Sequence, residues 1–186
     1  MNQYDGMEFL YHYYEKSAGP FRNLSELPLE QASAVQEDLK KAGGIFAAHR
    51  YDGYLERRRE LEQLARGLFA EKGGKPVRKV PHYMVVGECR WLQSWYREGE
   101  SVRLHISEFD PLTLSFTYGD MFPTFSPRVT DGKEYRGKVY MLGEITGLIR
   151  KYGLPQTWNE DGRYGPERYI EVQVWSDEPL RRFYRG

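Results

Sequence analysis

Residues 101–128, SVRLHISEFDPLTLSFTYGDMFPTFSPR, decide the fold that the sequence predicts. Apolar and polar residues alternate from 101 to 109, and this period of two is typical of a strand with one face on a core. Asp110-Pro111 favours a turn, and the alternation resumes from 112 to 118. We therefore predict two central strands that run close together. The apolar residues are Val102, Leu104 and Ile106 in the first strand and Leu112, Leu114, Phe116 and Tyr118 in the second.

A loop of unusual composition follows at residues 118–127. It combines three aromatic residues, two prolines with fixed φ and one glycine. Such a loop is stiff, and loops at strand ends are common places for ligand sites. The alternative is that Phe122 and Phe125 close the end of the sheet as part of its core.

The composition is that of an ordered protein with one core. The chain has 186 residues, 40% of them hydrophobic, and a core of this size buries roughly 70% of the unfolded surface. Its 27 basic and 27 acidic residues cancel, so no overall field attracts nucleic acid or an anionic membrane. The 15 tyrosines suit half-buried positions and binding surfaces.

Cysteine content and hydropathy predict a cytoplasmic location. Cys89 is the single cysteine, so the chain forms no disulfide within itself. The first residues lack a basic segment followed by an apolar run of secretory length, and no stretch approaches 18 apolar residues. We expect a cytoplasmic protein with no membrane partner.

The remaining segments alternate between strand and helix patterns, with no linker between them. We predict a single α+β domain over residues 1–186, with a mixed or mostly antiparallel sheet and three to four helices. The further strands are expected at 9–14, 45–48, 80–86 and 168–175, and the helices at 29–42, 51–71, 90–97 and 140–152.

Three consecutive arginines, Arg57, Arg58 and Arg59, lie on the longest predicted helix. Since charge runs usually form a solvated face, we expect their side chains to be exposed. The alternative is that they bind nucleic acid together with other basic residues, although the neutral charge of the chain argues against this. The other basic residues are Arg78, Lys79, Arg181, Arg182 and Arg185.

The last predicted strand, residues 168–175, carries a candidate ligand-binding carboxylate. Its alternation places Glu171 on the same side as Tyr169, Gln173 and Trp175. A carboxylate between an amide and two aromatic rings suits a ligand cleft. An outer sheet face edged by aromatic residues would give the same pattern, and the sequence leaves both open.

Several motifs of known catalytic sites are missing. A Walker A motif would need Gly where the chain has Phe69 and Ser or Thr where it has Pro76. The four histidines have no His or Cys at metal-ligand spacing, and neither G-x-S-x-G nor G-x-G-x-x-G occurs. We expect no NTPase, metal site, serine hydrolase or dinucleotide-fold dehydrogenase.

Four stretches resemble a family of short cytoplasmic proteins from Gram-positive bacteria, and the resemblance covers nearly the full length. It implies no particular activity. The four stretches are YHYYEKSAGPFRNLSELP, GYLERRRELEQL, FTYGDMFPTFSPRV and YGPERYIEVQVWSDEP.

The layout of LYHYY, NLSEL, SFTYGD and YIEVQVWSDEPL is also similar to the compact ADP-ribosyltransferase fold, particularly its small bacterial and toxin-type DNA-modifying branches. This resemblance implies NAD as the substrate. It implies that a first-strand His or Arg holds the adenosine side of NAD, that a middle-strand aromatic or hydroxyl residue lies against nicotinamide, and that a late-strand Glu acts on the nicotinamide ribose. These roles fall on His12, Tyr118 and Glu171, and Arg50 would pair with the pyrophosphate through its fork of donors.

The implied chemistry makes Glu171 the catalytic residue. When nicotinamide leaves, the ribose becomes oxocarbenium-like, and a carboxylate that accepts the ribose 2′-OH stabilises the positive charge. The other hypothesis is a non-catalytic module that binds a protein, peptide or nucleotide through a tyrosine-rich face. The first hypothesis requires His12, Tyr118 and Glu171 to line one cleft.

Overall fold

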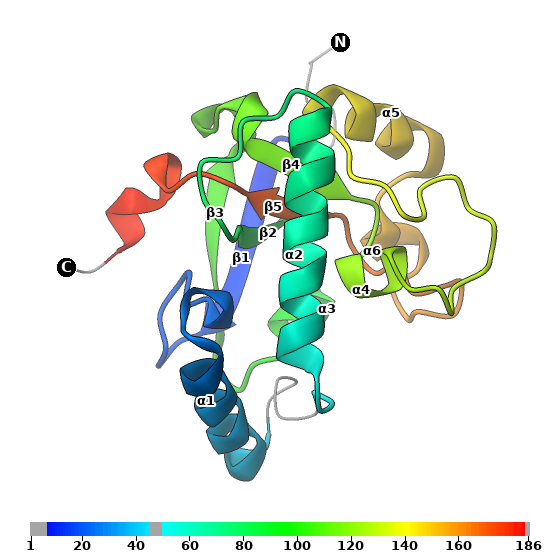
Figure 1. Ribbon diagram of the computed structural model, residues 1–186. Coiled ribbons are helices and arrows are strands. Elements are labelled where there is room, and N and C mark those ends of the chain that lie inside the picture. Colours follow the sequence, from blue (N-terminus) through cyan, green and yellow to red (C-terminus); the bar gives the residue numbers. More distant parts are fainter. Residues whose placement is uncertain (1–6, 45–49, 185–186) are drawn as a thin grey trace.

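The computed structural model describes residues 7–44 and 50–184 (Figure 1). The short strand expected at 45–48 lies outside the described residues. The fold is α+β, as predicted, and it is built on one antiparallel sheet of five strands in the order β3-β1-β2-β5-β4. The strands are β1 Phe9–Glu15, β2 His82–Val86, β3 Gly99–His105, β4 Leu114–Thr117 and β5 Glu171–Val174.

The two strands of residues 101–128 are not neighbours. β3 and β4 form the opposite edges of the sheet, so the prediction of two central, adjacent strands is wrong. Residues 106–113 connect these edges, which lie roughly 19 Å apart at four strand spacings. The connection runs through two 3-10 segments, η3 Ile106–Glu108 and η4 Pro111–Thr113. Asp110 caps the second, since its Oδ1 accepts the Leu112 N–H at 2.9 Å.

Three long helices occur where the sequence predicts them: α1 Leu29–Ala42, α2 Tyr54–Glu71 and α5 Leu142–Tyr152. The predicted helix at 90–97 is shorter, α3 Arg90–Gln93, and α4 Met121–Thr124 and α6 Pro155–Trp158 are further helices of one turn. Two 3-10 segments, η1 Leu24–Glu26 and η5 Glu178–Phe183, complete the described elements. Within residues 7–44 and 50–184, no helix combines the length and the apolar character needed to cross a membrane.

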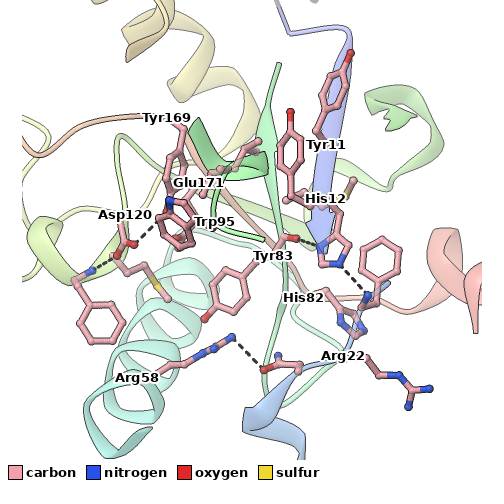
Figure 2. Close-up of a pocket in the computed structure, with 18 of the residues that line it drawn as sticks. Tyr11, His12, Arg22, Arg58, His82, Tyr83, Trp95, Asp120, Tyr169 and Glu171 are labelled. Carbon is pink, nitrogen blue, oxygen red and sulfur yellow. Dashed lines mark hydrogen bonds between the residues drawn. The ribbon is translucent and has the colours of Figure 1, made fainter. Parts of the chain in front are cut away.

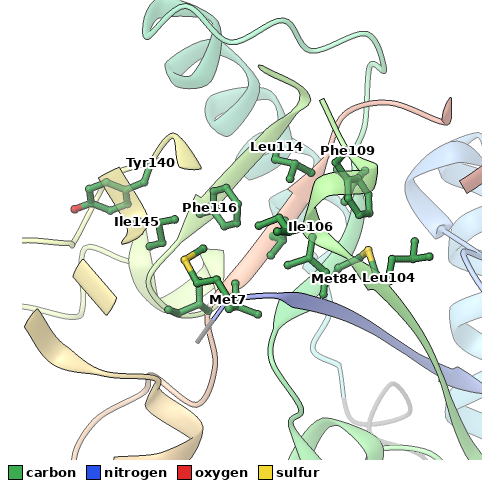
Figure 3. Close-up of a cluster of buried hydrophobic side chains, with 14 of the residues drawn as sticks. Met7, Met84, Leu104, Ile106, Phe109, Leu114, Phe116, Tyr140 and Ile145 are labelled. Atoms are coloured by element: carbon green, nitrogen blue, oxygen red, sulfur yellow. The ribbon is translucent and has the colours of Figure 1, made fainter. Parts of the chain in front are cut away.

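One face of the sheet carries the main hydrophobic core, which α5 covers (Figure 3). The strands present alternate residues to this face, so β4 contributes Leu114 and Phe116 and β5 contributes Val172 and Val174. α5 adds three buried residues spaced three or four apart on one side of the helix. They are Ile145, Leu148 and Ile149.

The other face is covered by α2 and α4, with α3 beside them (Figure 1). α2 buries Leu61, Ala65 and Phe69 against Trp175 of the sheet. Ser115, Thr117, Glu171 and Gln173 are also buried on this face. The two faces of β5 are therefore both closed to solvent, and only one of them is apolar throughout.

α1 has the predicted ends but not the predicted apolar stripe. Ala32 is buried, whereas Val35 is 38% exposed and Gln36 takes the neighbouring buried place. α1 therefore contributes little to the core, and its position matters mainly for the segment that precedes it.

Candidate functional site

A cavity of about 210 Å³ lies where α2 and α4 cover the sheet, and it continues to His12 and His82 of the other face (Figure 2). Sites that enclose a drug-sized ligand measure roughly 300–1,000 Å³, so this cavity would enclose one end of a larger molecule. Aromatic rings form most of its wall. The charged residues that line it are Arg22, Arg50, Arg58, Asp120 and Glu171.

The cavity reaches a split between β1 and β2. Their backbones pair only at Leu10↔Val86 and Tyr11↔Val85. Beyond these pairs the side chain of His12 connects the strands, with Nδ1 lying 2.8 Å from the carbonyl oxygen of Tyr83. The sheet is therefore open at the place where the first strand enters the cavity wall.

Both ring nitrogens of His12 have partners. Nδ1–H donates to the Tyr83 carbonyl, and Nε2 accepts the N–H of Phe21 at 2.8 Å. This arrangement requires a neutral ring, and burial lowers the pKa of His12 to about 4. Phe21 has φ 58°, a left-handed conformation rare for a bulky residue, and this conformation accompanies its N–H bond to the ring. His12 therefore ties two strands and a loop together.

Glu171 is 7% exposed, and a chain of buried hydrogen bonds fixes it from behind. The indole N–H of Trp175 donates to Ser115 Oγ at 2.8 Å, and the Ser115 hydroxyl donates to Gln173 Oε1 at 2.8 Å. The Gln173 amide then donates to Glu171 Oε1 at 3.0 Å. Burial and the negative charge of Asp120 raise the pKa of Glu171 well above its ordinary value.

Asp120 lines the same cavity from the N-terminus of α4. Its Oδ1 accepts the Phe122 N–H at 2.7 Å, which caps the helix, and its Oδ2 accepts the Tyr169 hydroxyl at 3.1 Å. Burial raises the pKa of Asp120, whereas these two donors and the cations of Arg58 and Arg50 lower it. The cavity thus holds two carboxylates on different elements.

Tyr83 of β2 and Arg58 of α2 are held to each other through Glu62. Glu62 Oε1 accepts hydrogen bonds from the Tyr83 hydroxyl at 2.7 Å, Arg58 Nε at 3.1 Å and Ser25 Oγ at 2.9 Å. The Arg58 guanidinium lies 4.8 Å from the centre of the Tyr83 ring. Glu62 is fully buried, so it fixes the ring and the cation that line the cavity.

Arg50 lines the cavity at the start of α2. Its guanidinium lies 4.5 Å from the centre of the Tyr54 ring, and Tyr54 stacks on Phe122 of α4 with ring centres 4.9 Å apart. The loop predicted at 118–127 therefore contributes to the cavity, since Asp120, Met121 and Phe122 all line it. Phe122 and Phe125 also pack on the apolar cluster of this face, as the alternative for these aromatic residues proposed.

The prediction that the three arginines of α2 form a solvated face is wrong. All three are half-buried, and each bonds to a neighbouring segment. Arg57 donates to the Phe125 carbonyl at 3.4 Å, Arg58 Nη2 to Asn23 Oδ1 at 3.1 Å, and Arg59 to the Leu27 carbonyl. Asn23 lines the cavity, so Arg58 fastens part of its wall to α2, while Arg57 and Arg59 hold neighbouring segments. Arg78 is similarly engaged, by Glu26 and Asp177.

Tyr118 lies away from the cavity. It is fully buried in the core of the opposite face, where its hydroxyl donates to the Gly153 carbonyl at 2.8 Å. Its ring centre lies 4.6 Å from that of Tyr135 and 5.9 Å from that of Tyr152. Of the residues assigned from the resemblance, His12, Arg50 and Glu171 line the cavity and Tyr118 does not, so the requirement that His12, Tyr118 and Glu171 line one cleft is not met for Tyr118.

Sequence reasoning missed Tyr83, Asp120 and Glu62. A signal for Tyr83 was present, because alternation in the strand at 80–86 places it opposite the apolar Met84. Asp120 follows Gly119 and precedes a turn of helix, which is a place where Asp commonly caps. Glu62 gave no signal beyond its place in a charged helix.

The residues that the structure describes contain no group of three or more His, Cys, Asp or Glu side chains that could hold a metal ion. Comparison of the chain with protein-family models, curated proteins and solved structures found no match. The function must therefore be argued from the cavity itself.

Proposed function

We propose that the cavity binds the nicotinamide ribose end of NAD and that Glu171 promotes transfer of ADP-ribose from it. The observation that carries the proposal is the Glu171 carboxyl group, which is buried in an aromatic cavity and bonded to Gln173 through one oxygen. A cleavable N-glycosidic bond needs such a carboxylate near the ribose, because the transition state develops positive charge there.

The walls of the cavity support the same chemistry. The resemblance to ADP-ribosyltransferases gave the residue against nicotinamide to Tyr118, which lies outside the cavity; independently of the resemblance, Tyr83 of β2, the central strand of the sheet, supplies an aromatic ring to the cavity wall. Arg50 and Arg58 supply positive charge at the same cavity, which suits the phosphates of a dinucleotide. The small volume is consistent with enclosure of the reacting end alone.

Protonation of Glu171 is linked to binding in this proposal. Burial and Asp120 raise its pKa, so loss of its proton is less favourable in the empty cavity than for an exposed glutamate. The pyridinium ring of NAD carries a positive charge, and a nearby positive charge favours the ionised carboxylate. Binding of NAD therefore releases the proton that Glu171 must lose before it can accept the ribose 2′-OH.

The reaction needs no further cofactor. The bond between the nicotinamide nitrogen and the ribose breaks, and its electron pair leaves with nicotinamide. The ionised Glu171 carboxylate accepts the hydrogen bond of the ribose 2′-OH as the ring becomes oxocarbenium-like. An acceptor nucleophile then takes the place of nicotinamide on the sugar.

The test combines NAD binding by calorimetry with a nicotinamide-release assay, on the wild-type protein and Glu171→Gln. We expect release to fall by about 100-fold or more in the variant, since removal of one group that stabilises transition-state charge costs this much in other enzymes. Glu37→Gln, an exposed change on α1, is the matched control and should leave release unchanged. Neither heat nor release in the wild-type protein would sink the proposal.

A second function, nucleotide binding without catalysis, is favoured by the positions of His12 and Tyr118. Both ring nitrogens of His12 are occupied, and Tyr118 lies on the opposite face. The same measurements separate the two functions, because this one predicts heat on adding NAD with no nicotinamide released by any variant.

A further inference from the structure

Among the described residues, the carboxylates that line the cavity are Asp120 and Glu171. They come from different elements, the N-terminus of α4 and the start of β5. Glu171 is bonded through Gln173 to the buried polar chain of the sheet, whereas Asp120 is half-buried and is held by the backbone of its own helix. Figure 2 shows Asp120 and Glu171 on the same side of the cavity, near Tyr169, whose hydroxyl donates to Asp120.

We propose that Asp120 is the base that takes the proton from the acceptor nucleophile. This inference rests on the proposed function, in which Glu171 already serves the donor sugar. As the acceptor oxygen or nitrogen forms its bond to the ribose carbon, nicotinamide leaves with the electron pair of the broken bond. The acceptor proton passes to the Asp120 carboxylate, so charge and atoms balance without any other reactant.

The hydrogen bonds of Asp120 leave it able to accept this proton. Each of its oxygens accepts one bond, from the Phe122 N–H and the Tyr169 hydroxyl. A carboxylate oxygen has about two lone-pair sites, so each retains capacity for a further donor. The cap also fixes the direction of the group, because its Oδ1 is anchored to the first turn of α4.

Different charges act on the two carboxylates. Burial raises the pKa of Asp120, while two hydrogen-bond donors and the arginines of the cavity oppose this rise and favour its ionised form. Glu171 experiences the negative charges of Asp120 and Glu62, so it holds a proton more readily until a cation enters. The titratable and charged groups that act on Asp120 or on which it acts are Arg50, Arg58, Tyr169 and Glu171.

The first test measures NAD hydrolysis, with water as acceptor, for the wild-type protein and Asp120→Asn. Asparagine keeps an oxygen for the Phe122 N–H, so the helix cap survives, but its amide cannot accept a proton. We expect kcat to fall by about 100-fold or more, which is the usual scale for loss of a general base, while the calorimetric Kd for NAD changes less than about threefold. The part of the acidic limb of the pH–rate profile that belongs to Asp120 should disappear in this variant, whereas the part that belongs to Glu171 should remain.

Tyr169→Phe provides a second test, which leaves Asp120 itself unchanged. It removes a donor to the carboxylate, which raises the pKa of Asp120, so the acidic limb should move to higher pH. Unchanged hydrolysis and an unchanged acidic limb in Asp120→Asn would overturn the inference. If Glu171→Gln still lowers release in that case, the proposed function stands without it; if neither variant has an effect, both fail.

Discussion

The two faces of β4 and β5 are equally buried but differ in chemistry. On one face Phe116 and Val172 pack among apolar side chains, and no polar side chain interrupts them along these strands. On the other face Ser115, Gln173 and Glu171 are buried as well, each with hydrogen bonds, and a cavity remains beside them. A single pair of strands thus provides a stable core on one side and a chemically competent wall on the other.

This difference follows from what apolar and polar side chains each need when they are buried. Apolar side chains pack to the density of a crystal, and a void there costs stability. Buried polar groups require partners of fixed direction, and the chain from Trp175 to Glu171 meets this requirement through side-chain donors and acceptors. The apolar face should therefore control stability, and the polar face should control ligand binding.

Among the variants that test this comparison, Phe116→Ala should have the largest effect on stability. Phe116 is fully buried on the apolar face, so its truncation should lower the free energy of unfolding by about 3–5 kcal/mol. Urea denaturation followed by circular dichroism measures this change. Val77→Ala, at a residue 73% exposed, is the control, and it should stay within about 0.5 kcal/mol of wild type. A loss below 1 kcal/mol at Phe116 would contradict the division between the faces.

The next effect is the pH dependence of stability that comes from His12, the residue that connects β1 and β2 where their backbones separate. Burial lowers the pKa of His12 from 6.5 to about 4, so the unfolded chain binds a proton on this residue before the folded protein does. Stability should therefore decrease as pH falls from 6.5 to 4, by on the order of 3 kcal/mol from this residue.

Urea denaturation at intervals of pH compares the wild-type protein with His12→Gln, which cannot titrate. His82 and the carboxylates remain in both proteins, so the difference between the two curves isolates His12. The difference should shrink as pH falls; parallel curves would show that His12 does not carry this dependence.

A smaller loss is expected from Tyr83→Phe on the polar face. The variant loses the hydrogen bond from the Tyr83 hydroxyl to Glu62, but Arg58 and Ser25 still bond to the same oxygen. We expect a loss of about 1–2 kcal/mol in the free energy of unfolding, less than for Phe116→Ala. Ligand binding should weaken more than this stability change implies, because the ring at position 83 would no longer be fixed to Glu62 in the cavity wall. A lower free energy of unfolding without any change in NAD binding would argue against Tyr83 as part of the site.

Local pattern predicted the elements of this protein better than their arrangement. The ends of α1 and the alternation of β5 follow from the sequence, because both depend on neighbouring residues. The separation of β3 and β4 could not be read, since alternation tells which face a residue takes and nothing about which strand lies beside it.

The candidate site, like the fold, could be predicted from the sequence only in part. Glu171 came from the alternation of its strand, and the loop at 118–127 was singled out for its composition. Tyr118 was assigned to the site from the resemblance, whereas the alternation that it shares with Phe116 places it on the apolar face. Asp120 and Glu62 could not be predicted as site residues, because their partners, Tyr169 and Tyr83, are distant in sequence.

The insertion of β5 between β2 and β4 has a consequence for biosynthesis. β2 pairs with β5 across Met84↔Val172, and β4 pairs with it across Phe116↔Val172, so neither neighbour is joined until the ribosome has passed residue 174. Pairings between such distant residues form slowly. While residues 118–174 are made, the nascent chain therefore exposes two strand edges that lack their partner β5, and the cavity is incomplete.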